Sequence, residues 1–170
     1  KVHDVDIAVS LDGREDIHNH NRQNWRQTME GISTLISAGY NNISVGATVT
    51  TETADSIADL VDFLINEGIQ SFSVSPVVSQ GRGKSVKGIS EQKWFETVIS
   101  MTNKILDWFN RGVCIREKNL DILLRYMATS IRDYMCTYHP CGAGNLMLAV
   151  DVSGGVYPCG HHLGNGDLFM

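Results

Sequence analysis

The stretch Ile-Ser-Val-Gly-Ala-Thr-Val at residues 43–49 decides the fold, because it predicts a β-strand flanked by two helices. Before it, apolar residues recur at helical spacing over residues 25–36, and Gly39 occupies a position typical of a helix C-terminus. After it, Thr53 is a candidate cap for a helix with an apolar stripe over residues 57–65. The order around this stretch is therefore helix, strand, helix.

Two more predicted strands extend this pattern on either side. Residues 4–10, Asp-Val-Asp-Ile-Ala-Val-Ser, alternate between apolar and polar side chains, as a strand does. Residues 70–75, Gln-Ser-Phe-Ser-Val-Ser, predict a third strand, which Pro76 closes. Strands that alternate with helices through short loops indicate parallel pairing with right-handed crossovers, so the predicted fold class is α/β.

The remaining sequence predicts helices and then a hairpin. Residues 77–89 are polar and Gly-rich, which indicates a loop, and Ser90 begins a long helix that ends near Gly112. A further helix is expected over about 120–134, and the apolar stripes of both helices are expected to pack against the sheet or each other. Alternating residues on either side of a Gly-rich turn predict a small β-hairpin over residues 146–158.

Composition limits the possible functions. The chain has 170 residues, of which 42% are hydrophobic, so it can bury a core. Its formal net charge is -5 without a Lys/Arg-rich run, which argues against nucleic acid as a partner. No apolar run is long enough for a membrane span and no signal peptide is evident, so we expect a cytoplasmic protein with reduced thiols. We also expect Lys1 and Met170 to be limits within a longer protein.

Three of the four cysteines are clustered near the C-terminus and predict a metal site. Their spacing is Cys136-x4-Cys141 followed by Cys141-x12-Gly154-x4-Cys159, and the hairpin should return the last thiol to the second. Three ligands do not complete a four-coordinate site, so the fourth is His139, His161, His162, an exogenous group or a cysteine beyond Met170. A zinc site or three inert thiols are the alternatives. Cys114, between two aliphatic residues, is expected to be a small buried hydrophobe.

The cysteine-rich segment resembles the opening element of the SPASM domain, Cys-x9–15-Gly-x4-Cys. The similarity extends through Cys-Gly-Ala-Gly at residues 141–144 and Val-Asp-Val-Ser-Gly-Gly-Val-Tyr-Pro-Cys at residues 150–159. This resemblance implies that Cys136, Cys141 and Cys159 bind an auxiliary [4Fe–4S] cluster, with the remaining ligands further along the chain.

The N-terminal part resembles the fourth barrel strand of radical S-adenosylmethionine (SAM) peptide-modifying enzymes. The matching residues are Val9-Ser10-Leu11-Asp12-Gly13, then Ile17-His18 and Arg22. The resemblance implies that Ser10 contacts the SAM carboxylate and that Arg22 joins it. His18, His20 and Asn19 are otherwise expected to be polar loop residues, and Ser10-Leu11-Asp12-Gly13 alone would predict only a strand end and a turn.

Two departures from this family matter. The Cys-x3-Cys-x2-Cys motif that holds the SAM-cleaving cluster is missing, so we expect this stretch of chain alone to be inactive. Gly160 follows Cys159 where sulfatase-maturating relatives commonly carry a proton-accepting Asp, which argues against that activity and leaves other peptide modification open. No catalytic residue is assigned.

The resemblance thus implies three domains: a partial radical SAM barrel (1–90), a helical bridge (91–134) and the start of a SPASM domain (135–170). The parent enzyme would form a 5′-deoxyadenosyl radical and modify a peptide or protein, with electrons from a donor such as flavodoxin or ferredoxin. The rival hypothesis is a zinc-stabilised α/β binding module without catalysis. A third possibility is a metal-free chain that self-associates through open barrel edges.

Overall fold

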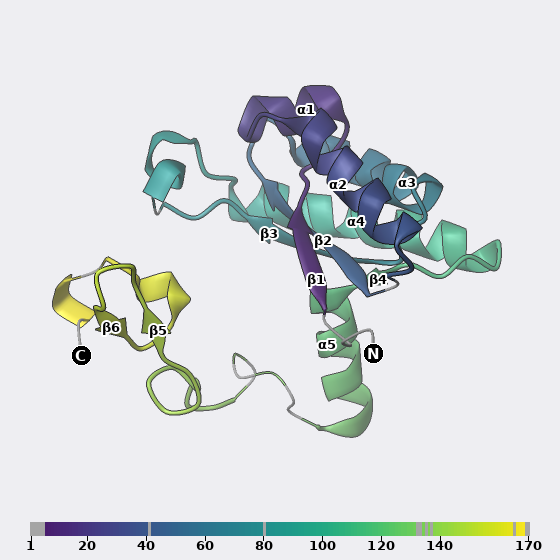
Figure 1. Ribbon diagram of the computed structural model, residues 1–170. Helices are drawn as coiled ribbons and strands as arrows, with labels where there is room; N and C mark the ends of the chain where they lie inside the picture. The colour runs from purple at the N-terminus through teal and green to yellow at the C-terminus, as the bar shows by residue number, and fades with distance from the viewer. Residues whose placement is uncertain are drawn as a thin grey trace. The chain divides into compact units, whose positions relative to one another are not determined.

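The computed structural model describes residues 6–40, 42–79, 81–131, 134, 136, 138–164 and 166–168. The chain forms two compact units, Lys1–Asp121 and Ile122–Met170. The first unit holds a parallel sheet with its helices, and the second holds a small antiparallel hairpin (Figure 1).

Four parallel strands form the sheet in the order β1-β2-β3-β4. Their bounds are Ile7–Ser10, Ile43–Val49, Ser71–Pro76 and Arg116–Glu117. The three predicted strands are confirmed within the described residues, and so is their parallel pairing; residues 4 and 5 of the first predicted strand lie outside the described residues. The fourth strand was not predicted, because two residues cannot display a period-two pattern.

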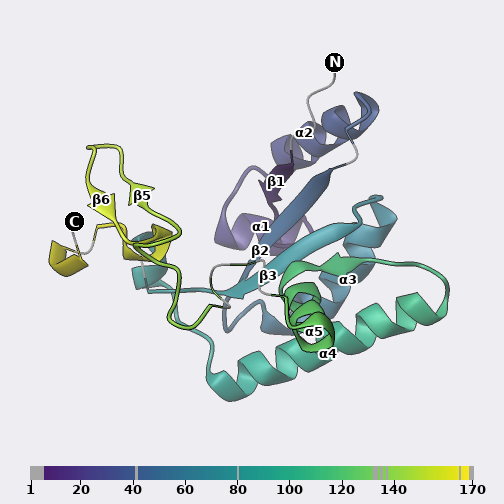
Figure 2. The ribbon, with the colours of Figure 1, turned by 90° about the horizontal axis from the view of Figure 1, so that it is seen from below.

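Three amphipathic helices, α2 (Trp25–Ser37), α3 (Ile57–Asn66) and α4 (Glu91–Asn110), cover one face of this sheet (Figure 2). Burial of each large apolar side chain between helix and sheet contributes roughly 1.5–3 kcal/mol. The core includes Val45, Ala47, Val49, Leu60, Leu64, Phe72 and Met101. The apolar stripes predicted for these helices are therefore the faces that pack on the sheet.

The ends of the helices follow the predicted signals with one exception. Ser90 caps α4, since its side chain accepts a hydrogen bond from the backbone N–H of Lys93 at 3.2 Å. Gly39 and Gly112, each two residues after the last residue of α2 or α4, adopt left-handed backbone angles. The cap predicted at Thr53 is wrong, because its hydroxyl accepts a hydrogen bond from the backbone N–H of Thr50 and a 3-10 turn, η1 (Ala54–Ser56), precedes α3.

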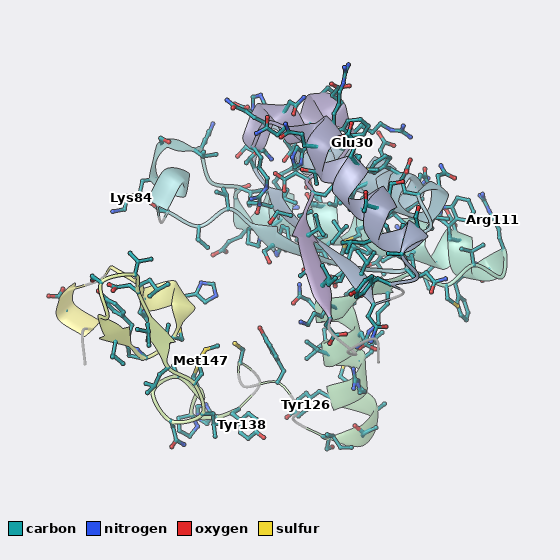
Figure 3. The ribbon with its side chains drawn as sticks, viewed as in Figure 1. Glu30, Lys84, Arg111, Tyr126, Tyr138 and Met147 are labelled. Carbon is teal, nitrogen blue, oxygen red and sulfur yellow. The ribbon has the colours of Figure 1, made fainter. Side chains whose placement is uncertain are left out.

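Two segments predicted as loops contain short helices. α1 (Glu15–Asn21) follows β1, and η2 (Gly81–Ser85) lies between β3 and α4. Neither segment has an apolar stripe long enough to predict a helix from sequence. Lys84 lies on the projecting loop that contains η2 (Figure 3), whereas α1 sits at the carboxyl end of β1 (Figure 1).

The last long helix, α5 (Lys118–Thr129), is shifted from the range predicted for it. It begins earlier because the Glu117 carboxylate accepts a hydrogen bond from the backbone N–H of Leu120 at 2.7 Å. It ends before 134 because Ser130 adopts a left-handed conformation with φ 57°. Among the described residues, no helix combines the length and the apolar character needed to cross a membrane.

The second unit contains the predicted hairpin. Its strands, β5 (Ala149–Val150) and β6 (Val156–Tyr157), pair in antiparallel fashion, with Ala149 opposite Tyr157. Two 3-10 turns follow, η4 (Gly160–His162) and η5 (Gly166–Leu168).

Candidate functional site

Polar side chains gather at the carboxyl ends of β1 and β2. The centre of this group is Asp12, whose side chain is only 1% exposed. Its Oδ1 atom accepts a hydrogen bond from the backbone N–H of Thr48 at 2.9 Å. Its Oδ2 atom accepts hydrogen bonds from Arg22 Nε at 2.9 Å and from Asn21 Nδ2 at 3.1 Å. The buried carboxylate therefore has both hydrogen-bond donors and a cation beside it.

Arg22, predicted to bind a carboxylate, lies at the C-terminal end of α1 and contacts this group directly. Besides its ion pair with Asp12, its Nη2 atom donates a hydrogen bond to Thr48 Oγ1 at 2.9 Å. Its side chain is 28% exposed, so it reaches solvent while its partner does not. Two of its five N–H groups are thus engaged by these protein partners.

His18 supports the same group from within α1 and is not the polar loop residue predicted. It is 2% exposed, and its Nδ1 accepts a hydrogen bond from the backbone N–H of Asp12 at 3.3 Å. Its Nε2 lies 3.1 Å from the carbonyl oxygen of Gln23. A carbonyl only accepts, so these partners assign a neutral ring with its hydrogen on Nε2. Burial lowers the pKa of His18, although the nearby Asp12 carboxylate acts in the opposite direction.

Ser10, the other predicted residue of this site, is exposed at the end of β1. It lies opposite Gly46 in the sheet, and Gly46 in turn lies opposite Ser73. These residues belong to the sheet face that the helices leave uncovered, where all side chains on β1 to β3 are small. The register places these residues on that face: Ala8, Ser10, Ser44, Gly46, Thr48, Ser71, Ser73 and Ser75.

This small-residue face is unusual for a parallel sheet, because such sheets are normally covered on both faces by bulky aliphatic side chains. Only small side chains from β1 to β3 lie on this face, and one of them, Thr48, contacts Arg22. Polar groups at the carboxyl ends of parallel strands are also where barrels bind their ligands. The arrangement suits a ligand that combines an apolar or aromatic body with an anionic group.

The cysteine segment lies in the second unit. Cys136 and Cys141 are exposed, and Cys159 is half-buried. The backbone N–H of Gly144 donates to the carbonyl oxygens of Met147 at 3.0 Å and Pro158 at 2.9 Å, so the turn after Cys141 is bonded to the residue before Cys159. Figure 3 labels Met147 in this unit. The predicted return of the hairpin toward Cys141 therefore agrees with these hydrogen bonds.

These bonds do not amount to a complete metal site. In the part of the chain that the structure describes, no three His, Cys, Asp or Glu side chains lie close enough to hold a metal ion. Cys136 is near Tyr134 instead, and burial together with the charge of Cys136 raises the pKa of that tyrosine. Met135 and Thr137 lie outside the described residues, so the approach of Cys136 to the other thiols stays a prediction.

Asp151 organises the hairpin turn in a way that its sequence alone did not indicate. Its Oδ1 accepts hydrogen bonds from the backbone N–H groups of Ser153 and Gly155, both at 2.8 Å, and from the Ser153 hydroxyl. Its Oδ2 accepts a hydrogen bond from the Tyr157 hydroxyl at 3.2 Å. Hydrogen bonds from Ser153 and then from Gly155 lower the pKa of Asp151. A Cβ atom on Gly155 would come within 2.7 Å of Asp151 Oδ2, so a side chain there would displace the carboxylate from these hydrogen bonds.

The expectation that Cys114 is buried is wrong. Its side chain is exposed, whereas the adjacent Ile115 fills the core position. Cys114 lines an open hollow of about 540 Å³ at the amino-terminal end of the strands, together with Ser71 and Arg116. It is therefore remote in the sheet from the Asp12 group, which lies at the carboxyl ends of the strands.

Comparison with solved structures identifies the fold. No protein-family model and no curated protein matches the chain. The structure of histidine-tagged anSMEcpe with bound AdoMet has a TM-score of 0.73 at 17% identity, over 92% of this chain and 42% of that chain. Native anSMEcpe with AdoMet and the Kp18Cys peptide has a TM-score of 0.73 at 17% identity, over 92% and 44%.

These neighbours are radical SAM sulfatase-maturating enzymes. The α/β fold with its parallel strands and small hairpin is thus a partial radical SAM fold, as predicted. The chain spans less than half the length of the solved structures that it matches. At this level of identity the likeness establishes the fold, and the chemistry has to be argued from the residues.

Proposed function

We propose that this chain is part of a radical SAM enzyme that modifies a side chain of a peptide or protein. The observation that carries the proposal is the position of Ser10 and Arg22 at the carboxyl ends of β1 and β2, within a fold whose solved examples hold AdoMet. Two of those examples also hold a peptide, which supports a peptide partner.

Arg22 and Ser10 have the chemistry that the amino-acid end of SAM requires. The guanidinium supplies a permanent cation with N–H groups matched to a carboxylate, and the exposed Ser10 hydroxyl supplies a further donor. In this proposal the nucleoside lies on the small-residue face beside them, where β1 to β3 carry no bulky side chain. Bound SAM supplies the capacity to abstract a hydrogen atom, while these residues bind and orient it.

Cys136, Cys141 and Cys159 would hold the auxiliary [4Fe–4S] cluster in this proposal. Thiolates are the ligands that such clusters take, and the Gly144–Pro158 hydrogen bond supports the approach of the last two. The division into residues 1–90, 91–134 and 135–170, the cytoplasmic location and an electron donor such as flavodoxin or ferredoxin belong to the same proposal.

A zinc-binding module is the second candidate, and one feature favours it. His161 and His162 lie two and three residues after Cys159, in η4, so two imidazole side chains are close to this thiol in the sequence. Cysteine and histidine together suit tetrahedral zinc. Catalysis separates the two candidates, because a zinc module would not cleave SAM.

The test is formation of 5′-deoxyadenosine by the complete protein that contains this chain. After anaerobic reconstitution with iron and sulfide and reduction with dithionite, we expect the product by mass spectrometry. At subsaturating SAM, Arg22→Gln should lower its rate about tenfold, because a charge-assisted hydrogen bond is lost. Arg26→Gln is the matched control, since Arg26 pairs with Glu15 at the surface. No 5′-deoxyadenosine from the iron-loaded wild-type protein would refute the proposal.

A further inference from the structure

We infer that Asp12 is a positioning residue: it orients the Arg22 guanidinium so that only its far edge is available to a ligand carboxylate. This inference rests on the proposed function and adds a residue that does not itself touch the ligand. It starts from a closed ring of three hydrogen bonds. Asp12 Oδ2 accepts from Arg22 Nε, Arg22 Nη2 donates to Thr48 Oγ1, and the backbone N–H of Thr48 donates to Asp12 Oδ1, all at 2.9 Å.

The ring joins three different elements. Asp12 follows β1, Arg22 is the C-cap residue directly after α1, and Thr48 lies within β2. Arg22 therefore cannot move away from the sheet with the end of the short helix without breaking two of the three bonds. Asn21 adds a fourth bond to Asp12 from the same end of the helix. The guanidinium is held in place before any ligand arrives, and less side-chain entropy is lost on binding.

The Asp12 and Arg22 side chains differ in their exposure to solvent, and this difference gives each a separate role in the pair. Asp12 has a 1% exposed side chain, and a buried carboxylate without a cation is strongly unfavourable. Arg22 is 28% exposed and can reach a ligand above the sheet. Asp12 thus depends on Arg22 for its charge balance, while Arg22 depends on Asp12 for its orientation.

The planar shape of arginine turns this orientation into selectivity. Nε–H and one Nη2–H lie along one side of the guanidinium, and both are already hydrogen-bonded, to Asp12 and Thr48. The end of the group carries the other two-donor edge, formed by Nη1 and the second hydrogen of Nη2. Two parallel N–H groups match the two oxygens of a carboxylate. A ligand without a carboxylate or a similar anionic group would gain nothing from this edge.

A comparison of two ligands tests the inference in the complete protein. SAM carries the amino-acid carboxylate, whereas 5′-methylthioadenosine keeps the nucleoside and the sulfur and lacks the carboxylate. We expect Asp12→Asn to raise the Kd for SAM about tenfold, the loss of one charge-assisted contact, and the Kd for 5′-methylthioadenosine less than about twofold. Thr48→Val removes the hydrogen bond between Arg22 and the Thr48 hydroxyl. It should also raise the Kd for SAM more than the Kd for 5′-methylthioadenosine, by a smaller factor than Asp12→Asn.

Glu15→Gln is the matched control, because Glu15 forms an ion pair with Arg26 that is exposed on both sides. It should leave both dissociation constants unchanged. If both Asp12→Asn and Thr48→Val weaken the two ligands equally, the ring is only structural and the inference is wrong. If neither variant changes SAM binding, it is also wrong. A wild-type protein that binds neither ligand would overturn the proposed function itself. If circular dichroism shows that Asp12→Asn does not fold, the Thr48→Val variant decides, through the change in its Kd for SAM relative to the change in its Kd for 5′-methylthioadenosine.

Discussion

His18 lies between the backbone of Asp12 and that of Gln23, and its neutral ring is needed to accept from one and donate to the other. A second proton on this ring would remove the acceptor and turn the Asp12 N–H away. The surroundings reinforce this preference, because burial lowers the pKa of His18 below the ordinary value of 6.5. Protonation of His18 would therefore break its hydrogen bond with the Asp12 backbone and weaken the site that this histidine supports.

The pH dependence of stability should show this effect. In the unfolded chain His18 takes up a proton near pH 6.5, while in the folded chain it does so only at lower pH. The free energy of unfolding should therefore fall as the pH drops below about 6.5 and level off below the lowered pKa. His18→Gln should remove this component, which urea unfolding between pH 8 and pH 5 would measure. His20→Gln, at an exposed histidine, is the control, and parallel curves for wild type and His18→Gln would contradict the assignment.

At this scale the sequence indicated only part of the site. Ser10 and Arg22 were predicted from the family motif, and their roles as ligands of SAM stay predictions. Asp12 was predicted as a turn residue and His18 as a loop residue. Their actual contacts depend on α1 folding back over the end of β1, and no periodicity in residues 15–21 indicates that helix. The residues of this buried hydrogen-bond network meet only in the folded chain, so no fixed spacing in the sequence predicts them.

The elements follow the sequence pattern more closely. β2 shows alternating burial along its whole length, since it pairs with a strand on either side and packs helices on one face. α4 has both a side-chain cap at Ser90 and a left-handed glycine at its end. Local signals of this kind act within a few residues, so they can be predicted. β4 depends instead on a tertiary contact, because the Glu117 carboxylate accepts a hydrogen bond from the backbone N–H of Val74 at 3.0 Å. The end of α5 depends on the uncommon left-handed backbone of Ser130.

The hairpin provides a prediction at the scale of an element. Gly155→Ala would push a methyl group against the Asp151 carboxylate, which the turn holds through several hydrogen bonds. We expect amide hydrogen exchange at Ser153 to become about tenfold faster and the iron bound per chain to fall, because the turn that returns the chain to Cys159 loosens. Gly166→Ala is the control, since a Cβ atom there meets no neighbour. Unchanged exchange in the Gly155→Ala protein would show that the Asp151 turn does not hold the hairpin.

For the molecule as a whole, the sheet has one face covered by helices and one face of small residues. Its order makes β1 and β4 the edge strands, and an uncovered edge strand can pair with another chain. The prediction of self-association through open barrel edges therefore stays a prediction, and sedimentation of the 170-residue chain would test it. The match covers less than half of the length of the solved structures, which are longer chains.

The central claim is our proposal that Cys136, Cys141 and Cys159 bind an iron–sulfur cluster in a radical SAM enzyme. Its most direct test is the iron, acid-labile sulfide and zinc content of the chain after anaerobic reconstitution, beside a Cys141→Ala/Cys159→Ala double variant. We predict iron and sulfide in nearly equal amounts in the wild-type chain and neither in the variant. One zinc ion per chain that excludes iron would contradict the claim.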